Sequence, residues 1–197
     1  MKKVVKFGGS SLASAEQFRK AGSIIRNDSA RRYVIPSAPG KRNPDDVKVT
    51  DMLYQCYKQA ILDDDREQDF EEILSKIEQR YDEIIDGLNL ELSLDSEFKV
   101  IRENFCKKIG RDYAASRGEY LNGIIMAEYL GYTFIDAAEV ICFDENGEFA
   151  SEITNERLSE RLKGVECAVI PGFYGAMPNG RVKTFSRGGS DITGSIV

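Results

Sequence analysis

The chain has 197 residues, of which 42% are hydrophobic and 30% charged, and its formal net charge is −6. This composition is typical of a folded domain with a sizeable core and excludes a disordered or fibrous protein. The negative balance argues against nucleic acid and anionic membranes as partners, because both attract basic surfaces. No apolar run reaches the roughly 18 residues of a membrane span, and no apolar signal segment is visible, so a cytoplasmic protein is expected.

The chain contains no histidine, and its four cysteines form no C-x-x-C pair. A zinc site and a histidine-assisted serine or cysteine hydrolase are therefore excluded. Any chemistry has to use carboxylates, lysine, arginine, backbone amides or a metal. The cysteines are expected to be reduced, packed thiols, and they are Cys56, Cys106, Cys142 and Cys167.

The first elements predict a β-α-β unit with a right-handed crossover. Residues 2–7 form a β-branched run that ends at a glycine pair, as a strand entering a tight turn does. Ser14 and Gln17 have the spacing of a capping box, and apolar residues then recur at helical intervals. Residues 31–42 predict a second strand that runs into a proline- and glycine-containing loop.

Residues 50–108 have a helical pattern throughout, and a further helix is expected at 118–131. Within this region, the acidic stretch 63–69 is interpreted as a solvated helix end or connector, and a helix is expected from Ser96 to Ile109. The excursion spans about residues 51–110.

Strands return after residue 131. Residues 132–141 predict a strand, 141–151 a hairpin around Asn146-Gly147, and 154–162 a short helix. Residues 166–175 form an apolar run typical of a buried parallel strand, and 180–186 predict another strand. The alternation indicates an α/β fold with a mostly parallel sheet and a helical excursion.

Loops of small residues follow four of these strands, at 6–11, 36–40, 171–175 and 186–190. Such loops meet at one edge of a parallel sheet, where ligands bind. Gly8 and Gly9 would let backbone amides approach a phosphate, helped by the helix that follows, and Lys6 adds a positive charge. The pattern matches neither the Walker loop nor the Rossmann glycine fingerprint, and by itself it is equally an ordinary strand turn.

The closing motif "SRGGSD" is more informative. Ser190 is a natural N-cap and Asp191 falls in the first turn of a helix at 191–197. Arg187 offers a fork for a carboxylate or phosphate, and Asp191 can hold Mg²⁺. Alternatively, Asp191 stabilises the helix dipole and Arg187 is a surface cation.

Three further residues are candidates with ordinary structural alternatives. Glu119 follows Gly118 and is expected in the first turn of a helix, where a glutamate is favourable without any function. Thr50 is expected to be an N-cap. Phe173 lies in a glycine-rich turn and could simply pack.

Several of these segments, "KFGGSS", "SAPGKRNPDDVKVTDML", "RGEYLNG", "VIPGFYG" and "TFSRGGSDITG", resemble the aspartate kinases of the amino-acid kinase family in order and approximate spacing. The resemblance runs from residue 2 to 194. It implies a three-layer α/β/α sandwich and transfer of the γ-phosphate of ATP, with Mg²⁺, to the side-chain carboxylate of L-aspartate. The product would be 4-phospho-L-aspartate, on the route to lysine, threonine and methionine.

The resemblance also implies roles for single residues. It assigns the phosphate loop to Lys6, Gly8, Gly9 and Ser10, and Ser37 to the second glycine-rich loop. It assigns aspartate binding to Thr50, Glu119, Phe173, Arg187 and Ser190, and metal and phosphate organisation to Asp191. It implies that residues 1–197 form the N-terminal, substrate-binding part of a kinase, without the base-binding half and the regulatory ACT domains. The segment alone is expected to be inactive, and the full-length protein to be a homo-oligomer.

Two alternatives stay open. Another amino-acid kinase, such as a glutamate or acetylglutamate kinase, would share the phosphate loop but present a different pocket. A non-catalytic aspartate-binding fragment would retain the fold without turnover.

Overall fold

The computed structural model describes residues 2–62, 67–186 and 188–197. A four-stranded sheet lies at its centre, formed by β1 (Lys3–Phe7), β2 (Arg31–Pro36), β3 (Thr133–Phe134) and β4 (Ala168–Val169). The strand order is β1-β2-β4-β3, and every pair is parallel. The predicted α/β class with a mostly parallel sheet is confirmed.

The chain between β1 and β2 forms the predicted crossover. It contains a short 3-10 helix, η1 (Gly9–Leu12), followed by helix α1 (Ala15–Arg26). The side chain of Ser14 accepts a hydrogen bond from the amide of Gln17, so the predicted cap is present. The last residue of β1, Phe7, lies opposite Pro36 of β2, and both strands therefore deliver their loops to the same edge of the sheet.

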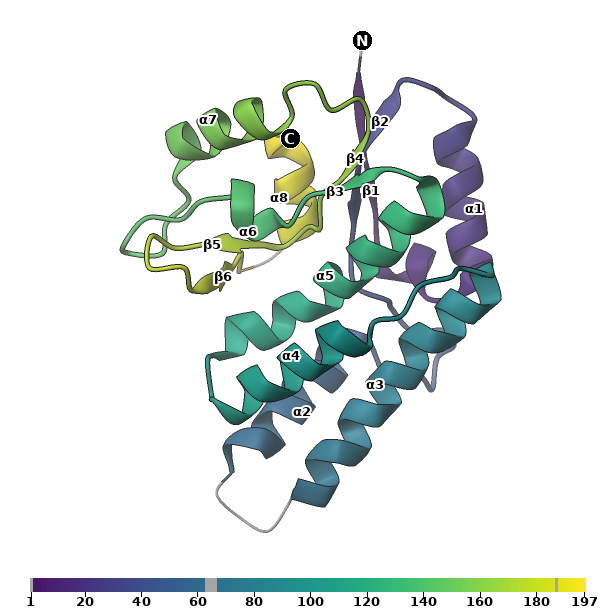
Figure 1. Cartoon of the computed structure of the whole chain (residues 1–197), viewed down its shortest axis with the longest axis vertical. Helices are drawn as coiled ribbons and strands as arrows, with labels where there is room; N and C mark the ends of the chain where they lie inside the picture. The colour runs from purple at the N-terminus through teal and green to yellow at the C-terminus, as the bar shows by residue number, and fades with distance from the viewer. Residues whose placement is uncertain (1, 63–66, 187) are drawn as a thin grey trace.

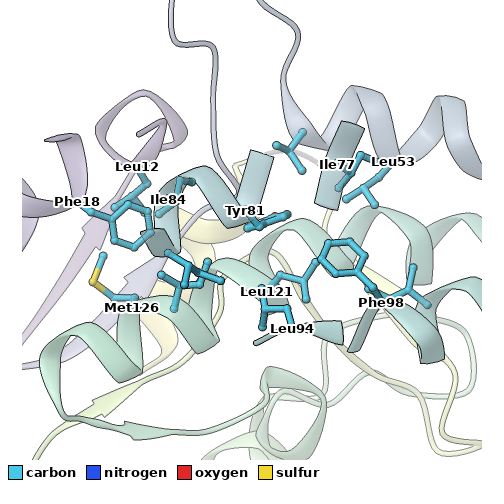
Figure 2. Close-up of a cluster of buried hydrophobic side chains, with 14 of the residues drawn as sticks. Leu12, Phe18, Leu53, Ile77, Tyr81, Ile84, Leu94, Phe98, Leu121 and Met126 are labelled. Carbon is cyan, nitrogen blue, oxygen red and sulfur yellow. The ribbon is translucent and has the colours of Figure 1, made fainter. Parts of the chain in front are cut away.

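The helical excursion consists of α2 (Val49–Ile61), α3 (Glu67–Leu88), α4 (Asp95–Cys106) and α5 (Arg111–Leu130). Figure 1 shows this bundle extending away from the sheet, with α1 and α5 close to the strands. Residues 63–66 of the predicted acidic connector lie outside the described residues, and α3 begins at Glu67. Figure 2 shows buried apolar side chains of these helices and of α1 meeting in one core, among them Phe18, Leu53, Ile77, Tyr81, Ile84, Phe98, Leu121 and Met126.

The opposite face of the sheet is covered by α6 (Ala137–Val140), α7 (Ser151–Arg161) and α8 (Gly189–Ile196), together with the strands β5 (Tyr174–Ala176) and β6 (Val182–Thr184). Side chains of the central strands alternate between the two cores, as a period of two requires. Val34 packs with the bundle, whereas Tyr33 and Ile35 pack with the opposite layer. The arrangement is the expected three-layer sandwich, with the bundle as an addition to one layer.

Three strand predictions need correction. Of residues 132–141 only β3 is extended, because Asp136 caps α6 by accepting a hydrogen bond from Ala138 N. The turn at Asn146-Gly147 is present, but its ladder is the single bridge between Phe143 and Phe149. The strand predicted at 180–186 does not join the parallel sheet. It is β6, which pairs antiparallel with β5, because the short turn between them can join only antiparallel strands.

One helix boundary and two caps also differ from the predictions. Helix α5 begins at Arg111 instead of 118, so Glu119 lies in its interior rather than in a first turn. Gly118 is not a boundary; a Cβ there would come within 2.7 Å of the Cβ of Ala38. Lys48, not Thr50, occupies the N-cap of α2, and Gly188, not Ser190, that of α8.

The four cysteines are free thiols, but they do not share one environment. Cys56 and Cys142 are buried as expected, whereas Cys167 is half-buried and Cys106 is exposed. Burial raises the pKa of the Cys56 thiol to about 12. No helix in the described ranges is both long and apolar enough to cross a bilayer.

Candidate active site at the carboxyl edge of the sheet

The glycine loops after β1 and β2 touch each other through their backbones. Gly40 donates its amide hydrogen to the carbonyl of Gly9 at 2.8 Å. A Cβ on Gly9 would lie 2.7 Å from the carbonyl oxygen of Ala38, and one on Gly40 would lie 2.6 Å from the carbonyl carbon of Gly9. Only glycine allows this approach, so the pairing of the two loops requires both residues.

The turn after β1 differs in detail from the expectation. Gly8 has extended backbone geometry, and the chain enters η1 at once, with Ser11 donating to the Gly8 carbonyl at 3.0 Å. Helix α1 starts only at Ala15. The amides available to an anion beside Gly9 and Ser10 therefore belong to a 3-10 turn, and the α1 terminus does not begin there.

Lys6 and Asp191 meet across the site. Lys6 lies near the end of β1 and Asp191 in the first turn of α8, and their Nζ and Oδ1 atoms are 3.0 Å apart. The side chain of Asp191 remains 69% exposed. An ion pair this open contributes little to stability. It does place a cation and a carboxylate at the edge where the glycine loops lie.

Ser37 and Ser190 join the second glycine loop to α8. The Ser37 hydroxyl donates to the Ser190 hydroxyl oxygen at 3.0 Å. Gly172 follows β4, and a Cβ there would lie 2.6 Å from the Ser190 hydroxyl oxygen. Residues from two loops and the first turn of α8 therefore converge on one contact, as expected for the carboxyl edge of the sheet.

Glu119 is the most unusual charged residue of the site. Its side chain is buried, and its Oε2 atom has no hydrogen-bond partner among the residues that the structure describes. Burial raises the pKa of this carboxyl to about 8, although hydrogen bonds from the amides of Ala38 and Glu119 itself partly oppose the shift. A buried carboxylate without a cationic partner is costly, so the position favours a bound cation.

A cavity of about 420 Å³ lies between the two glycine loops and Glu119. Its lining includes both glycine loops, Thr50 and Glu119, and two lysines at its rim, Lys41 and Lys48. The volume suits an amino acid together with a phosphate group. A cavity of about 440 Å³ lies on α2 beside Tyr54 and Arg111, and none of the predicted site residues lines it.

Phe173 and Arg187 complete the predicted set. Phe173 has a left-handed φ of 82°, which is strained for a bulky residue, and its amide donates to the Thr193 hydroxyl at 3.1 Å. Its carbonyl accepts from Phe185, so the strain is held by contacts with α8 and the β6 exit. Arg187 lies outside the described residues.

Asn122 was missed by the sequence reasoning. It lies one turn after Glu119 on α5, is fully buried, and donates to the Ser37 carbonyl at 2.6 Å, while its own Oδ1 has no partner within residues 2–62, 67–186 and 188–197. Its spacing of three residues from Glu119 places both on one helix face, and that signal was available in the sequence.

The described side chains fit Mg²⁺ through a single carboxylate and not through a cage of several ligands. Within the described ranges, no three Asp, Glu or Cys residues cluster as a metal cage. Mg²⁺ is commonly held by one or two carboxylates plus substrate phosphates and water, and the exposed carboxylate of Asp191 can serve as that one.

The family follows from a comparison over the full sequence. Residues 1–197 match the amino acid kinase family. The chain belongs to that family. The glycine loops, Lys6 and Asp191 are thus found in an amino acid kinase fold.

Relatives of this amino acid kinase include aspartokinases. It is 36% identical to aspartokinase 3 of Bacillus subtilis (strain 168) over 209 residues, which cover 99% of this chain and 45% of that protein. The crystal structure of Clostridium acetobutylicum aspartate kinase matches with a TM-score of 0.91 and 49% identity, covering 100% of this chain and 45% of that one. E. coli aspartokinase III in complex with aspartate and ADP matches with a TM-score of 0.81, covering 100% and 46%; at 22% identity it supports the fold alone. The chain spans less than half the length of these proteins.

Proposed function

We propose that the protein containing this chain transfers the γ-phosphoryl group of MgATP to the side-chain carboxylate of L-aspartate, giving 4-phospho-L-aspartate and ADP. The observation that carries the proposal is the buried carboxylate of Glu119, whose Oε2 atom lacks a partner among the described residues, in the cavity that the glycine loops also line. The ammonium group of an amino acid supplies the missing cation. This reaction is the first step towards lysine, threonine and methionine.

The acceptor needs binding and orientation rather than activation. A carboxylate is already ionised at neutral pH, so its attack on phosphorus requires no general base, and a chain without histidine can perform it. Glu119 holds the α-ammonium and Arg187 the α-carboxylate, which leaves the side-chain carboxylate directed at the γ-phosphate. Thr50, Phe173 and Ser190 shape the rest of this subsite.

The phosphates lie along the glycine loops. Backbone amides near Gly8, Gly9 and Ser10 and the hydroxyl of Ser37 donate to phosphate oxygens. Lys6 offsets the repulsion between two anions and follows the phosphoryl group during transfer. Asp191 holds Mg²⁺ directly or through water, and the metal supplies charge neutralisation of the phosphates when it is bound.

The same geometry discriminates among acceptors. N-acetylglutamate carries a neutral amide in place of the ammonium, so it would leave Glu119 buried without a cation. Glutamate keeps the ammonium but adds a methylene, which moves its carboxylate relative to Lys6. Aspartate is therefore the acceptor that we propose.

The remainder of the protein has separate roles in this proposal. It supplies the half that binds adenine and ribose and regulatory ACT domains, and it assembles as a homo-oligomer in the cytoplasm. Residues 1–197 form the substrate-binding part and do not turn over alone.

Trapping of the acyl phosphate tests the proposal. The intact protein is incubated with MgATP and hydroxylamine plus aspartate, glutamate or N-acetylglutamate, and the acyl hydroxamate is measured. We expect the aspartyl product to exceed the others by at least ~100-fold, a ratio equivalent to about 2.7 kcal/mol of discrimination. A larger glutamyl product would assign a different acceptor, and aspartate binding without any hydroxamate would make the protein a non-catalytic binder.

A further inference from the structure

Arg80 is a buried arginine of α3 that reaches into the glycine loops. Only 4% of its surface is exposed. Its Nη2 donates to the Gly40 carbonyl at 2.7 Å and to the Ala13 carbonyl at 3.5 Å, while Nη1 donates to Asp46 Oδ2 at 2.7 Å. One side chain of the helical bundle therefore binds the segments that follow both β1 and β2.

The Gly40 residue is held from both sides by these contacts. Its amide hydrogen bonds to the Gly9 carbonyl, and its carbonyl accepts from Arg80. Any movement of Gly40 is transmitted to Gly9, because the two backbones are in close contact and would otherwise separate or collide. It is also transmitted to Ala38, whose amide binds Glu119.

Asp46 forms hydrogen bonds within the loop that follows β2. Its carboxylate accepts from the Arg42 backbone amide at 2.8 Å and from Arg42 Nε at 3.0 Å. Burial would raise the pKa of Asp46, but the hydrogen bonds from Arg42 and Arg80 outweigh it and hold the pKa well below its usual value. Arg42 also binds Glu83 of α3 at 2.8 Å, so the loop is attached to α3 at two points.

We propose that Arg80, together with Asp46, is a positioning residue for phosphoryl transfer: it fixes the Gly40 and Gly9 backbones, and thereby couples the helical bundle to the reaction without touching substrate. The proposal rests on the proposed function. An arginine fork suits this task because it donates in two directions at once, to a carbonyl and to a carboxylate, whereas a lysine ammonium cannot span both in a fixed geometry. Misplacement of reacting groups by about 1 Å can cost roughly 100-fold in rate.

Arg80→Met and Arg80→Lys in the intact protein test this role, with Arg102→Met as the matched control. Arg102 lies on α4 and pairs with Glu71 and Glu78 of α3, so it also links two elements of the bundle, and neither pair includes a residue of the glycine loops. We measure kcat, both KM values, the thermal midpoint without ligands, and hydrogen exchange of residues 37–46.

We expect kcat to fall by roughly 100-fold for Arg80→Met, which loses both contacts, by about 10-fold for Arg80→Lys, which can keep one of them, and to stay within twofold for Arg102→Met. Exchange at 37–46 should rise in both Arg80 variants well below their unfolding temperatures, while α5 stays protected. If Arg80→Met does not fold, Arg80→Lys carries the test.

Arg80 variants with kcat within threefold of the wild type, or with unchanged exchange at 37–46, would overturn the proposal. Failure of the proposed function has a different signature. In that case the wild type shows no aspartate-dependent ADP release, and the exchange comparison still decides whether Arg80 holds the loops.

Discussion

The molecule contains two glycine pairs after strands, and they use glycine for different reasons. Gly9 has an ordinary backbone but lies against Ala38 and Gly40, where a side chain would collide with backbone atoms. Gly188 has a left-handed φ of 59° and open space around it. Gly9 permits a close approach between loops, and Gly188 permits a turn into α8, while a Cβ on its neighbour Gly189 would lie 2.8 Å from the Cα of Phe173. Identical dipeptides therefore predict different sensitivities to substitution.

The two pairs also differ in what anchors them. Gly9 is bound through Gly40 to the buried Arg80 of the helical bundle. Gly189, next to Gly188, packs on Phe173, and α8 reaches the first loop through the exposed pair of Asp191 with Lys6. We expect the first loop to be rigid before substrates bind. We expect the segment around Gly188 and Gly189 to contribute groups that rearrange when phosphate replaces Asp191 as a partner of Lys6.

The largest expected effect is at the point where the two regions meet. Lys6→Met removes the charge that offsets anion repulsion but keeps the length of the side chain, and we expect kcat to fall by about 1,000-fold, a value typical of a lost transition-state contact. Thermal stability should change little, because the carboxylate of its partner Asp191 is largely exposed.

Lys3→Met is the matched control for this substitution. Lys3 belongs to the same strand but pairs with Asp28 at the other end. Its kcat should be unchanged, and equal losses in both variants would remove Lys6 from the phosphate site.

Comparison of Gly9→Ala with Gly188→Ala tests the difference between the pairs directly. We expect Gly9→Ala to lower kcat by at least ~100-fold, because the loops must separate to admit a methyl group. Gly188→Ala should cost about 1 kcal/mol of stability from backbone strain and less than tenfold in kcat. Steady-state kinetics and thermal unfolding measure both. Equal kinetic losses would show that the pairs are not distinguished by the contact with Gly40.

Glu119→Gln separates the amino-acid subsite from the phosphate subsite. The neutral amide cannot pair with an ammonium, and we expect the aspartate KM to rise by roughly 30-fold, equivalent to about 2 kcal/mol, while the ATP KM stays within twofold. Initial rates with each substrate varied in turn measure both constants. A matched rise in the two would contradict the assignment of Glu119.

The pH dependence of stability tests the burial of Glu119 without an activity measurement. The folded protein retains a proton on Glu119 up to a pKa of about 8, whereas the unfolded chain releases it near 4.5. Stability from this group therefore falls as the pH rises between these values, with an upper limit on the order of 5 kcal/mol. Thermal midpoints of the wild type and Glu119→Gln between pH 5 and 8.5 should diverge, with the variant increasingly more stable. Parallel curves would show that Glu119 is not buried without a partner.

The sequence predicted the regular parts of the fold because their signals are local. The Ser14 cap, the apolar face of α3 and the β-α-β unit each follow from spacing within one segment. The predicted start of α5 was wrong because Gly118 was interpreted as a helix boundary. Gly118 instead lies against Ala38, a contact that only the tertiary structure creates. The antiparallel pairing of β6 was missed for a similar reason.

The candidate site was predictable as a set of residues but not as an environment. Lys6, Gly9, Glu119 and Asp191 were selected from motifs, yet the burial of Glu119 depends on how α5 crosses beneath the loops. Arg80 was not selected, although it falls within the apolar stripe of α3, between Ile77 and Ile84. A charged residue in such a stripe is a signal that a buried partner exists.

Aspartate-dependent ADP release from MgATP by the intact protein, with residues 1–197 alone and with glutamate as controls, tests the central claim most directly. The account predicts release by the intact protein with aspartate, less than about 1% of that rate with glutamate, and none from residues 1–197. No aspartate-dependent release from an intact, folded protein would contradict it.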